Sequence, residues 1–202
     1  MTEPLARRTF SGTVKLFLLW WVLSTLGWGL GTLVAWVTER EMRHLLPGVP
    51  WYDLVPHVHV SSTVGLALFG MIVGLFQAWA IKRKVRMTTR SWVLTTTIGW
   101  LLESVSVAVT LNLGTTLAQW WLLRKHSDWA WIWPLFGFFA VLFASQTGVA
   151  VMSAVAGTAG SVVAILSFAL PAGALYGAIS GIGIAVISLT MHSEEQANKA
   201  IG

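Results

Sequence analysis

The stretch that decides the fold reads GMIVGLFQAWAIKRKVRMTTRSWVLTTTIGW, from Gly70 to Trp100. It consists of an apolar run, a group of basic residues and a second apolar run. Five cations stand between the two runs: Lys82, Arg83, Lys84, Arg86 and Arg90. Cations beside apolar runs hold helix ends at the cytoplasmic face of a membrane. The stretch therefore predicts a transmembrane helical hairpin with its turn at that face.

The composition of the whole chain agrees with this prediction. Of the 202 residues, 55% are hydrophobic and only 10% are charged, and the mean hydropathy is +0.71. Soluble domains carry about 25% charged residues, so this chain lacks the polar surface of a soluble globule. Crossing a bilayer takes about 20 apolar residues, and the apolar runs allow about six crossings. We expect an all-α, polytopic transmembrane bundle, one domain over residues 1–202.

The net charge of +5 does not indicate nucleic-acid binding, because the dense basic clusters adjoin apolar runs. Such clusters set topology and meet anionic lipid headgroups. We therefore place both termini and the topology anchors on the cytoplasmic side; the anchors are Lys82, Arg83, Lys84, Arg86, Arg124 and Lys125. The absence of cysteine excludes disulfides and thiolate-bound metals.

Apolar runs and helix breakers give the boundaries of the predicted spans. The spans cover residues 14–37, 61–81, 91–110, 114–124, 129–155 and 162–190. Between the first two spans, residues 38–60 form an outer polar segment, with a short helix to about Leu46 and then a folded loop. The polar tail from His192 is expected to fray.

Two intervals allow a second interpretation. Residues 91–123 are short for two crossings, so one long tilted helix over 92–123 is the alternative to a hairpin. In the final apolar region the best turn is Gly157–Ser161, which leaves two long helices, the second kinked near Pro171. Turns near Met152 and Pro171 would instead give three short spans.

Short motifs recur along the chain. Residues 20–28, WWVLSTLGW, align with residues 92–100, WVLTTTIGW, and residues 77–83, QAWAIKR, align with residues 119–125, QWWLLRK. Direct repeats tend to stack as units with the same orientation. The repeats therefore favour the hairpin over one long helix, and they predict six spans in three hairpin-like repeats.

The repeated motifs resemble those of a group of uncharacterised bacterial polytopic membrane proteins, built from helical hairpins of the form G-x-x-x-Q-W-x-x-L-R. The last helix of that group resembles GALYGAISG at residues 173–181. The resemblance covers residues 14–189 and implies the fold, the repeat and a location in the bacterial cytoplasmic (inner) membrane. It implies no activity and no catalytic residue. The short hairpin at residues 91–124 and the long outer segment depart from the pattern.

Glycines four residues apart predict close helix packing. In lipid, where hydrophobicity does not drive helices together, small residues let two backbones approach. The predicted packing positions are Gly27, Gly31, Gly70, Gly74, Gly173, Gly177 and Gly181.

Few side chains in the chain are candidates for chemistry. Glu103 is the one carboxylate within a predicted span, and a charge at membrane depth costs at least about 2.5 kcal/mol. It is either a proton or ion site or a solvated residue near the outer interface. His57 and His59 could bind a metal with Asp53 or Glu41, but no third ligand stands at a suitable spacing. We therefore predict no metal site and interpret the histidines as an interfacial pair.

The sequence carries none of the common catalytic signatures, such as H-E-x-x-H, a P-loop or G-x-S-x-G. We expect a non-enzymatic accessory or scaffold subunit of a larger membrane complex, in contact with the lipid bilayer and with other transmembrane subunits. Lipid is the expected ligand, and quinone or pigment are further candidates. The candidate contacts for such a ligand are His57, His59, Gln77, Gln119 and Trp100. The alternative is a small proton- or ion-coupled transporter that uses Glu103.

Overall fold

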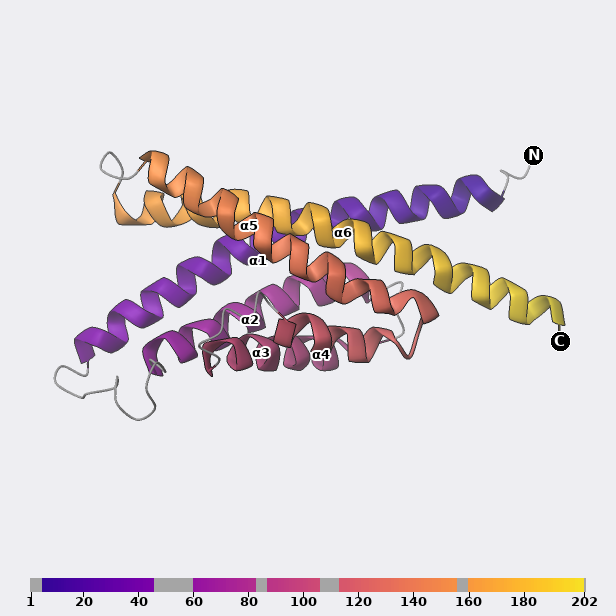
Figure 1. Ribbon diagram of the computed structural model, residues 1–202, viewed down its shortest axis with the longest axis horizontal. Coiled ribbons are helices and arrows are strands. Elements are labelled where there is room, and N and C mark those ends of the chain that lie inside the picture. Colours follow the sequence, from indigo (N-terminus) through magenta and orange to yellow (C-terminus); the bar gives the residue numbers. More distant parts are fainter. Residues whose placement is uncertain (1–4, 46–59, 83–86, 106–112, 156–159, 202) are drawn as a thin grey trace.

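The computed structural model is helical throughout the residues it describes, which are 5–45, 60–82, 87–105, 113–155 and 160–201 (Figure 1). Within these residues there are six α-helices and one short 3₁₀ helix. They are α1 (Leu5–Leu45), α2 (Val60–Ile81), α3 (Thr89–Val105), α4 (Leu113–Leu123), η1 (Asp128–Ile132), α5 (Trp133–Val155) and α6 (Ser161–Ile201). The predicted all-α class is confirmed.

Four of these helices are long and apolar enough to cross a membrane. The spans lie within Ser11–Met42, Thr63–Ile81, Asp128–Val155 and Ser161–Met191. The two remaining helices are shorter. The 17 residues of α3 extend about 26 Å and the 11 residues of α4 about 17 Å, against a hydrocarbon thickness of about 30 Å.

The interval from residue 92 to residue 123 contains two helices, so the alternative of one long helix is wrong. They pack antiparallel, because Gly99 of α3 lies against Thr115 of α4 while Gly114, at the start of α4, lies beside Leu102 near the end of α3. The interval between the two predicted spans, residues 111–113, lies partly outside the described residues, and its last residue, Leu113, belongs to α4.

The final apolar region contains two long helices, with the break between Val155 and Ser161 where the turn is predicted. Because α5 continues through Met152 and α6 continues through Pro171, the alternative of three short spans is wrong.

Two helices are longer than the predicted spans. Helix α1 continues through the polar residues 38–45, and α6 continues through residues 192–201, where a frayed tail was expected. Residues 38–45 contain two Glu and two Arg, and residues 192–201 contain Glu, Gln, Lys and Ala; all of these have high intrinsic helix propensity. Once an apolar helix is formed, adding residues of this kind costs little because the helix needs no new nucleus. The rest of the predicted outer segment, residues 46–59, lies outside the described residues.

The helices form a closed ring. In the described part of the chain each helix packs on the next one in sequence, and α6 packs on α1. Successive α-helices run in opposite directions, so the start of α1 and the end of α6 lie at the same end of the bundle (Figure 1). We call this end the basic end, because four exposed cations lie there: Lys82, Arg90, Arg124 and Lys125. The end that carries Arg40 and His44 is called the opposite end.

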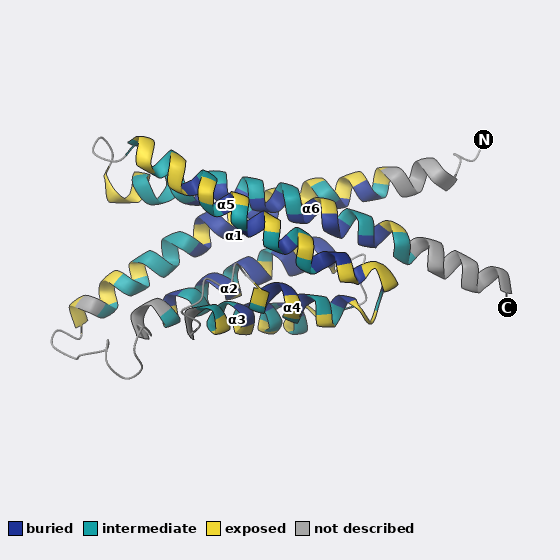
Figure 2. Ribbon diagram, viewed as in Figure 1, coloured by how far each residue is buried: buried dark blue, intermediate teal, exposed yellow. Residues whose placement is uncertain are grey.

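Buried side chains line the inside of the ring, and exposed ones face outward (Figure 2). The core has two levels. One contains Trp20, Trp92 and Trp133, and the other contains Trp28 and Phe69. The outward faces stay apolar, which is the distribution expected of a bundle whose solvent is lipid.

Candidate functional site

Three buried tryptophans meet inside the ring. Trp20 of α1, Trp92 of α3 and Trp133 of α5 are each at most 1% exposed. Their ring centroids are 5.7 to 6.1 Å apart, and all three pairs meet edge to face. Edge-to-face aromatic pairs contribute about 0.5–1.5 kcal/mol each beyond the burial of their area. The three odd-numbered helices are therefore joined at one level.

Two buried glutamines connect these indoles to the even-numbered helices. Trp92 Nε1 donates to Gln77 Oε1 at 3.3 Å, and Trp133 Nε1 donates to Gln119 Oε1 at 3.1 Å. The glutamines also meet, since Gln119 Nε2 donates to Gln77 Oε1 at 3.3 Å. The same Nε2 donates to Thr96 Oγ1 at 2.9 Å. One connected set of hydrogen bonds thus joins α2, α3, α4 and α5.

The remaining two helices, α1 and α6, are also hydrogen-bonded or joined to this set. Gln77 Nε2 lies 3.4 Å from Tyr176 Oη, to which it donates. Trp20 Nε1 of α1 donates to Ser180 Oγ at 2.9 Å, and Ser180 Oγ donates to the Tyr176 carbonyl oxygen at 2.6 Å. We call the eight residues of all six helices the glutamine–tryptophan network: Trp20, Gln77, Trp92, Thr96, Gln119, Trp133, Tyr176 and Ser180.

The polar side chains of the network are hydrogen-bonded to one another. Its groups are amides, indoles and hydroxyls, and both amide groups of Gln77 and Gln119 are engaged with other side chains. Leaving a buried polar group without a partner costs about 1–3 kcal/mol, so each engaged group resists being withdrawn to bind something else. Gln77 and Gln119, which the sequence marks as candidate contacts for a ligand, are both fully buried in the core.

The seven predicted packing glycines all face a neighbouring helix of the same chain. Gly27 and Gly31 face α2, Gly70 and Gly74 face α3, and Gly173, Gly177 and Gly181 face α1. A Cβ added at Gly70 would lie 2.9 Å from Trp100 Cβ, and one added at Gly173 would lie 2.6 Å from Trp28 Cβ. These ridges are therefore used inside the bundle and are not open to partner helices.

Sequence reasoning missed several further contact glycines, and the tightest contacts among them are those of Gly99 and Gly137. A Cβ added at Gly99 would clash with the backbone of Thr115, and one at Gly137 with the side chain of Thr116. Gly99 lies within the repeated G-W motif, which was a usable signal. Gly137 lies among phenylalanines with no glycine three or four residues away, so no ridge pattern marks it.

The other residues predicted to contact a ligand do not belong to the glutamine–tryptophan network. Trp100 belongs to the second core level, with its ring centroid 4.6 Å from that of Phe69 and 6.2 Å from that of Trp28. His57 and His59 lie outside the described residues, as do three of the topology anchors: Arg83, Lys84 and Arg86. Among the residues that the structure describes, no group of three or more acidic or histidine side chains is placed to hold a metal ion.

Glu103 lies near the end of α3, where α3 and α4 cross. Its side chain is half-buried. A Cβ added at Gly114 would lie 3.6 Å from Glu103 Oε1. The carboxylate is thus at the edge of the crossing on the side of the opposite end, well away from the glutamine–tryptophan network.

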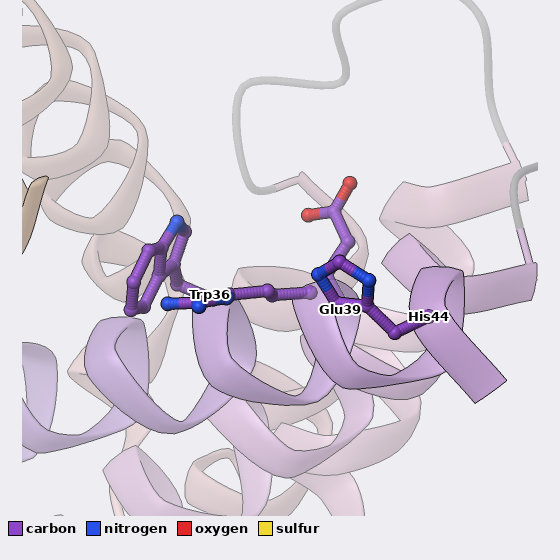
Figure 3. A pocket seen from close by; sticks show the side chains of 4 residues that line it. Trp36, Glu39 and His44 are labelled. Carbon is purple, nitrogen blue, oxygen red and sulfur yellow. The ribbon is translucent and has the colours of Figure 1, made fainter.

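A surface pocket of about 410 Å³ lies at the opposite end of α1 (Figure 3), lined by Trp36, Glu39, Arg40 and His44. The Arg40 guanidinium carbon lies 5.6 Å from the Trp36 ring centroid. Sequence reasoning missed this pocket because it separated the polar residues from the first span. In the continuous helix, the i, i+4, i+8 spacing of residues 36, 40 and 44 puts them on one face.

Comparisons with protein-family models, with curated proteins and with solved structures found no match for this chain. The resemblance to polytopic proteins with repeated hairpins stays a prediction.

Proposed function

We propose that the chain is a non-enzymatic integral membrane protein that serves as an accessory or scaffold subunit of a larger membrane complex. The glutamine–tryptophan network carries this proposal. A site for chemistry or transport needs polar groups free to meet a substrate, whereas the polar groups of this network bind one another across all six helices. Such an interior suits a rigid structural part.

The proposed architecture is six membrane crossings arranged as three hairpins, α1–α2, α3–α4 and α5–α6. Support comes from the way the buried tryptophans bond. Trp92 donates to Gln77 and Trp133 donates to Gln119, so each bonds the second helix of the preceding hairpin. Trp20 donates to Ser180 of the last hairpin. Three times around the ring, a tryptophan on the first helix of a hairpin thus donates to a side chain on the second helix of the hairpin before it.

Glycine contacts repeat in the same manner and support the same architecture. A Cβ added at Gly70 of α2 would meet Trp100, and one added at Gly74 would meet Thr96. In the same way, a Cβ added at Gly173 of α6 would meet Trp28, and one added at Gly177 would meet Ser24. Trp28 and Ser24 stand 72 positions before Trp100 and Thr96, the same offset that aligns residues 20–28 with residues 92–100. The α6–α1 and α2–α3 contacts are therefore built from equivalent positions.

The proposed orientation places the basic end and both termini in the cytoplasm of a bacterium. Support comes from the clustering of Lys82, Arg90, Arg124 and Lys125 at one end, as the positive-inside rule requires. A bilayer can thin locally, or flanking residues can reach the interface, to accommodate helices as short as α3 and α4.

Partner helices would meet the outward faces of the bundle, since the glycine ridges are occupied. Helix α5 offers one such face, where Leu135, Phe139 and Phe143 are exposed at a four-residue spacing. Flat aromatic surfaces suit close contact with another helix or with an apolar ring system. Lipid covers this face when no partner is bound.

Purification in a mild detergent, followed by measurement of mass and visible absorbance, tests the proposal. A scaffold subunit is expected to co-purify with other membrane proteins at a mass well above the 22.0 kDa of the chain, and a bound pigment would add a visible absorption band. A lone, colourless monomer would contradict the proposal.

The alternative function is proton- or ion-coupled transport through Glu103. One observation favours it, namely the half-buried carboxylate at the α3–α4 crossing, because carboxylates at membrane depth commonly serve ion pathways. Uptake into proteoliposomes that is lost in Glu103→Gln but kept in Glu39→Gln would support transport. Equal fluxes in all three proteins would remove Glu103 from the mechanism.

A further inference from the structure

Two tryptophan–cation pairs stand at the basic end of the bundle. The Arg124 guanidinium carbon lies 3.2 Å from the Trp121 ring centroid and 5.5 Å from that of Trp120. Lys82 Nζ lies 6.0 Å from the Trp79 ring centroid. Trp79 and Trp121 are 57% and 51% exposed, although both are large apolar side chains. Each pair therefore presents an open ring beside an exposed positive charge.

The two pairs repeat at the same height in the bundle. Each tryptophan follows a network glutamine by two residues, and each cation follows its tryptophan by three. Because Gln77 and Gln119 are hydrogen-bonded to each other, the two pairs are fixed at the same level by the core. Helix α2 ends at Ile81 and α4 ends at Leu123, so both cations stand directly after the last helical residue.

This combination is suited to the boundary between hydrocarbon and headgroups. Exposed indoles concentrate at that boundary. A guanidinium stacked on an indole face keeps its N–H groups directed outward in its own plane, which matches the oxygens of a phosphate. The local charge is net positive, since Arg124 and the exposed Lys125 outweigh Asp128 at the start of η1.

We propose that Arg124, Trp121 and Lys125 form a binding site for the headgroup phosphate of an anionic phospholipid, and that Lys82 with Trp79 forms a second copy. The inference rests on the proposed function, because it requires the basic end to lie at a leaflet surface. The indoles contact the upper acyl chains and glycerol, while the cations contact the phosphate. Preference for an anionic over a zwitterionic lipid follows from the net positive charge of the site.

Thermal unfolding of the purified full-length protein in a neutral detergent tests the site, with three additions compared: phosphatidylglycerol, phosphatidylcholine and inorganic phosphate. Phosphatidylglycerol is expected to raise the unfolding temperature by clearly more than phosphatidylcholine does, and inorganic phosphate is expected to have no effect. The triple substitution of Lys82→Gln, Arg124→Gln and Lys125→Gln, which removes the described cations of both sites, should remove most of this difference. The control Arg40→Gln, a tryptophan-paired arginine at the opposite end, should keep it.

Three results would overturn the inference. They are equal stabilisation by both lipids, stabilisation by inorganic phosphate as strong as by phosphatidylglycerol, and a lipid preference that survives the triple substitution. Counting lipid adducts by native mass spectrometry gives a second readout that does not depend on the stability of the variant. If the preference is missing while a cysteine at position 125 is labelled only from the cytoplasm, this site alone is refuted. Labelling from outside would instead refute the proposed orientation.

Discussion

Gln119 forms hydrogen bonds with side chains of three other helices. Its amide donates to Gln77 of α2 and to Thr96 of α3, and it accepts from Trp133 of α5 while standing on α4. Hydrogen bonds between helices in a membrane are individually modest, about 0.6 kcal/mol on average. Removing a partner so that several buried groups lose their bonds at once costs more than one such bond.

Gln119→Leu is therefore expected to destabilise the protein by about 2–4 kcal/mol, because Trp133 Nε1 loses its acceptor and Thr96 Oγ1 and Gln77 Oε1 each lose a donor. Unfolding in detergent, followed by intrinsic fluorescence or by heat, measures the loss. The control is Gln146→Leu, the same substitution at an exposed position of α5, which should change stability little. Equal effects of the two substitutions would show that the network does not hold the bundle together.

At this scale the sequence marks the right residues but not their partners. The repeat singles out Gln77 and Gln119. Gln119, like Gln77, is fully buried in the bundle. Which donors surround it depends on helices distant in sequence, and a single sequence does not reveal those contacts.

Among the helices, α3 and α4 form the shortest hairpin and the one with the closest backbone approach at a glycine. Gly99 stands directly against the backbone of Thr115, and the backbone oxygen of Gly99 lies 3.2 Å from a Cβ added at Gly114. A backbone neighbour cannot rotate away as a side chain can. The packing of this hairpin thus depends on having no side chain at residue 99.

Gly99→Ala is expected to destabilise the protein by about 1–3 kcal/mol or more, the usual cost of overpacking, because the helices must separate to admit the methyl group. Gly160→Ala is the matched control, since a Cβ at that position would meet nothing within 4 Å. The loss of stability is measured by comparing the thermal unfolding temperatures of the two variants with that of the wild type. An unchanged temperature for Gly99→Ala would contradict the close approach of α3 and α4.

Helix positions are largely predictable from apolar runs, while helix lengths are not. The presence of two helices in the final apolar region, for example, follows from the glycines and the serine of the predicted turn Gly157–Ser161. The extensions of α1 to Leu45 and of α6 to Ile201 were missed because hydropathy measures where a helix leaves lipid and says nothing of where it ends. Helix propensity in the polar flanks is the signal that would have found them.

For the molecule as a whole, the central claim is a ring of three hairpins with every basic turn on one side of the membrane. Similar motifs along the chain predict repetition. Closure of the ring by α1 and α6 does not follow from any local pattern, because Trp20 and Ser180 are 160 residues apart. Ser180 occupies the position that Gln77 and Gln119 occupy in the other two hairpins. Because a serine stands there in place of a glutamine, the third copy of the motif is not recognisable in the sequence.

Cysteine accessibility in intact cells tests the central claim most directly, because the chain has no cysteine of its own. Lys125→Cys marks the basic end, and Gly160→Cys marks the opposite end; both positions are exposed. A membrane-impermeant maleimide applied from outside is expected to label Gly160→Cys at once and Lys125→Cys only after the membrane is opened. Labelling of Lys125→Cys from outside would contradict the proposed orientation, and labelling of both positions from the same side would contradict the three-hairpin topology.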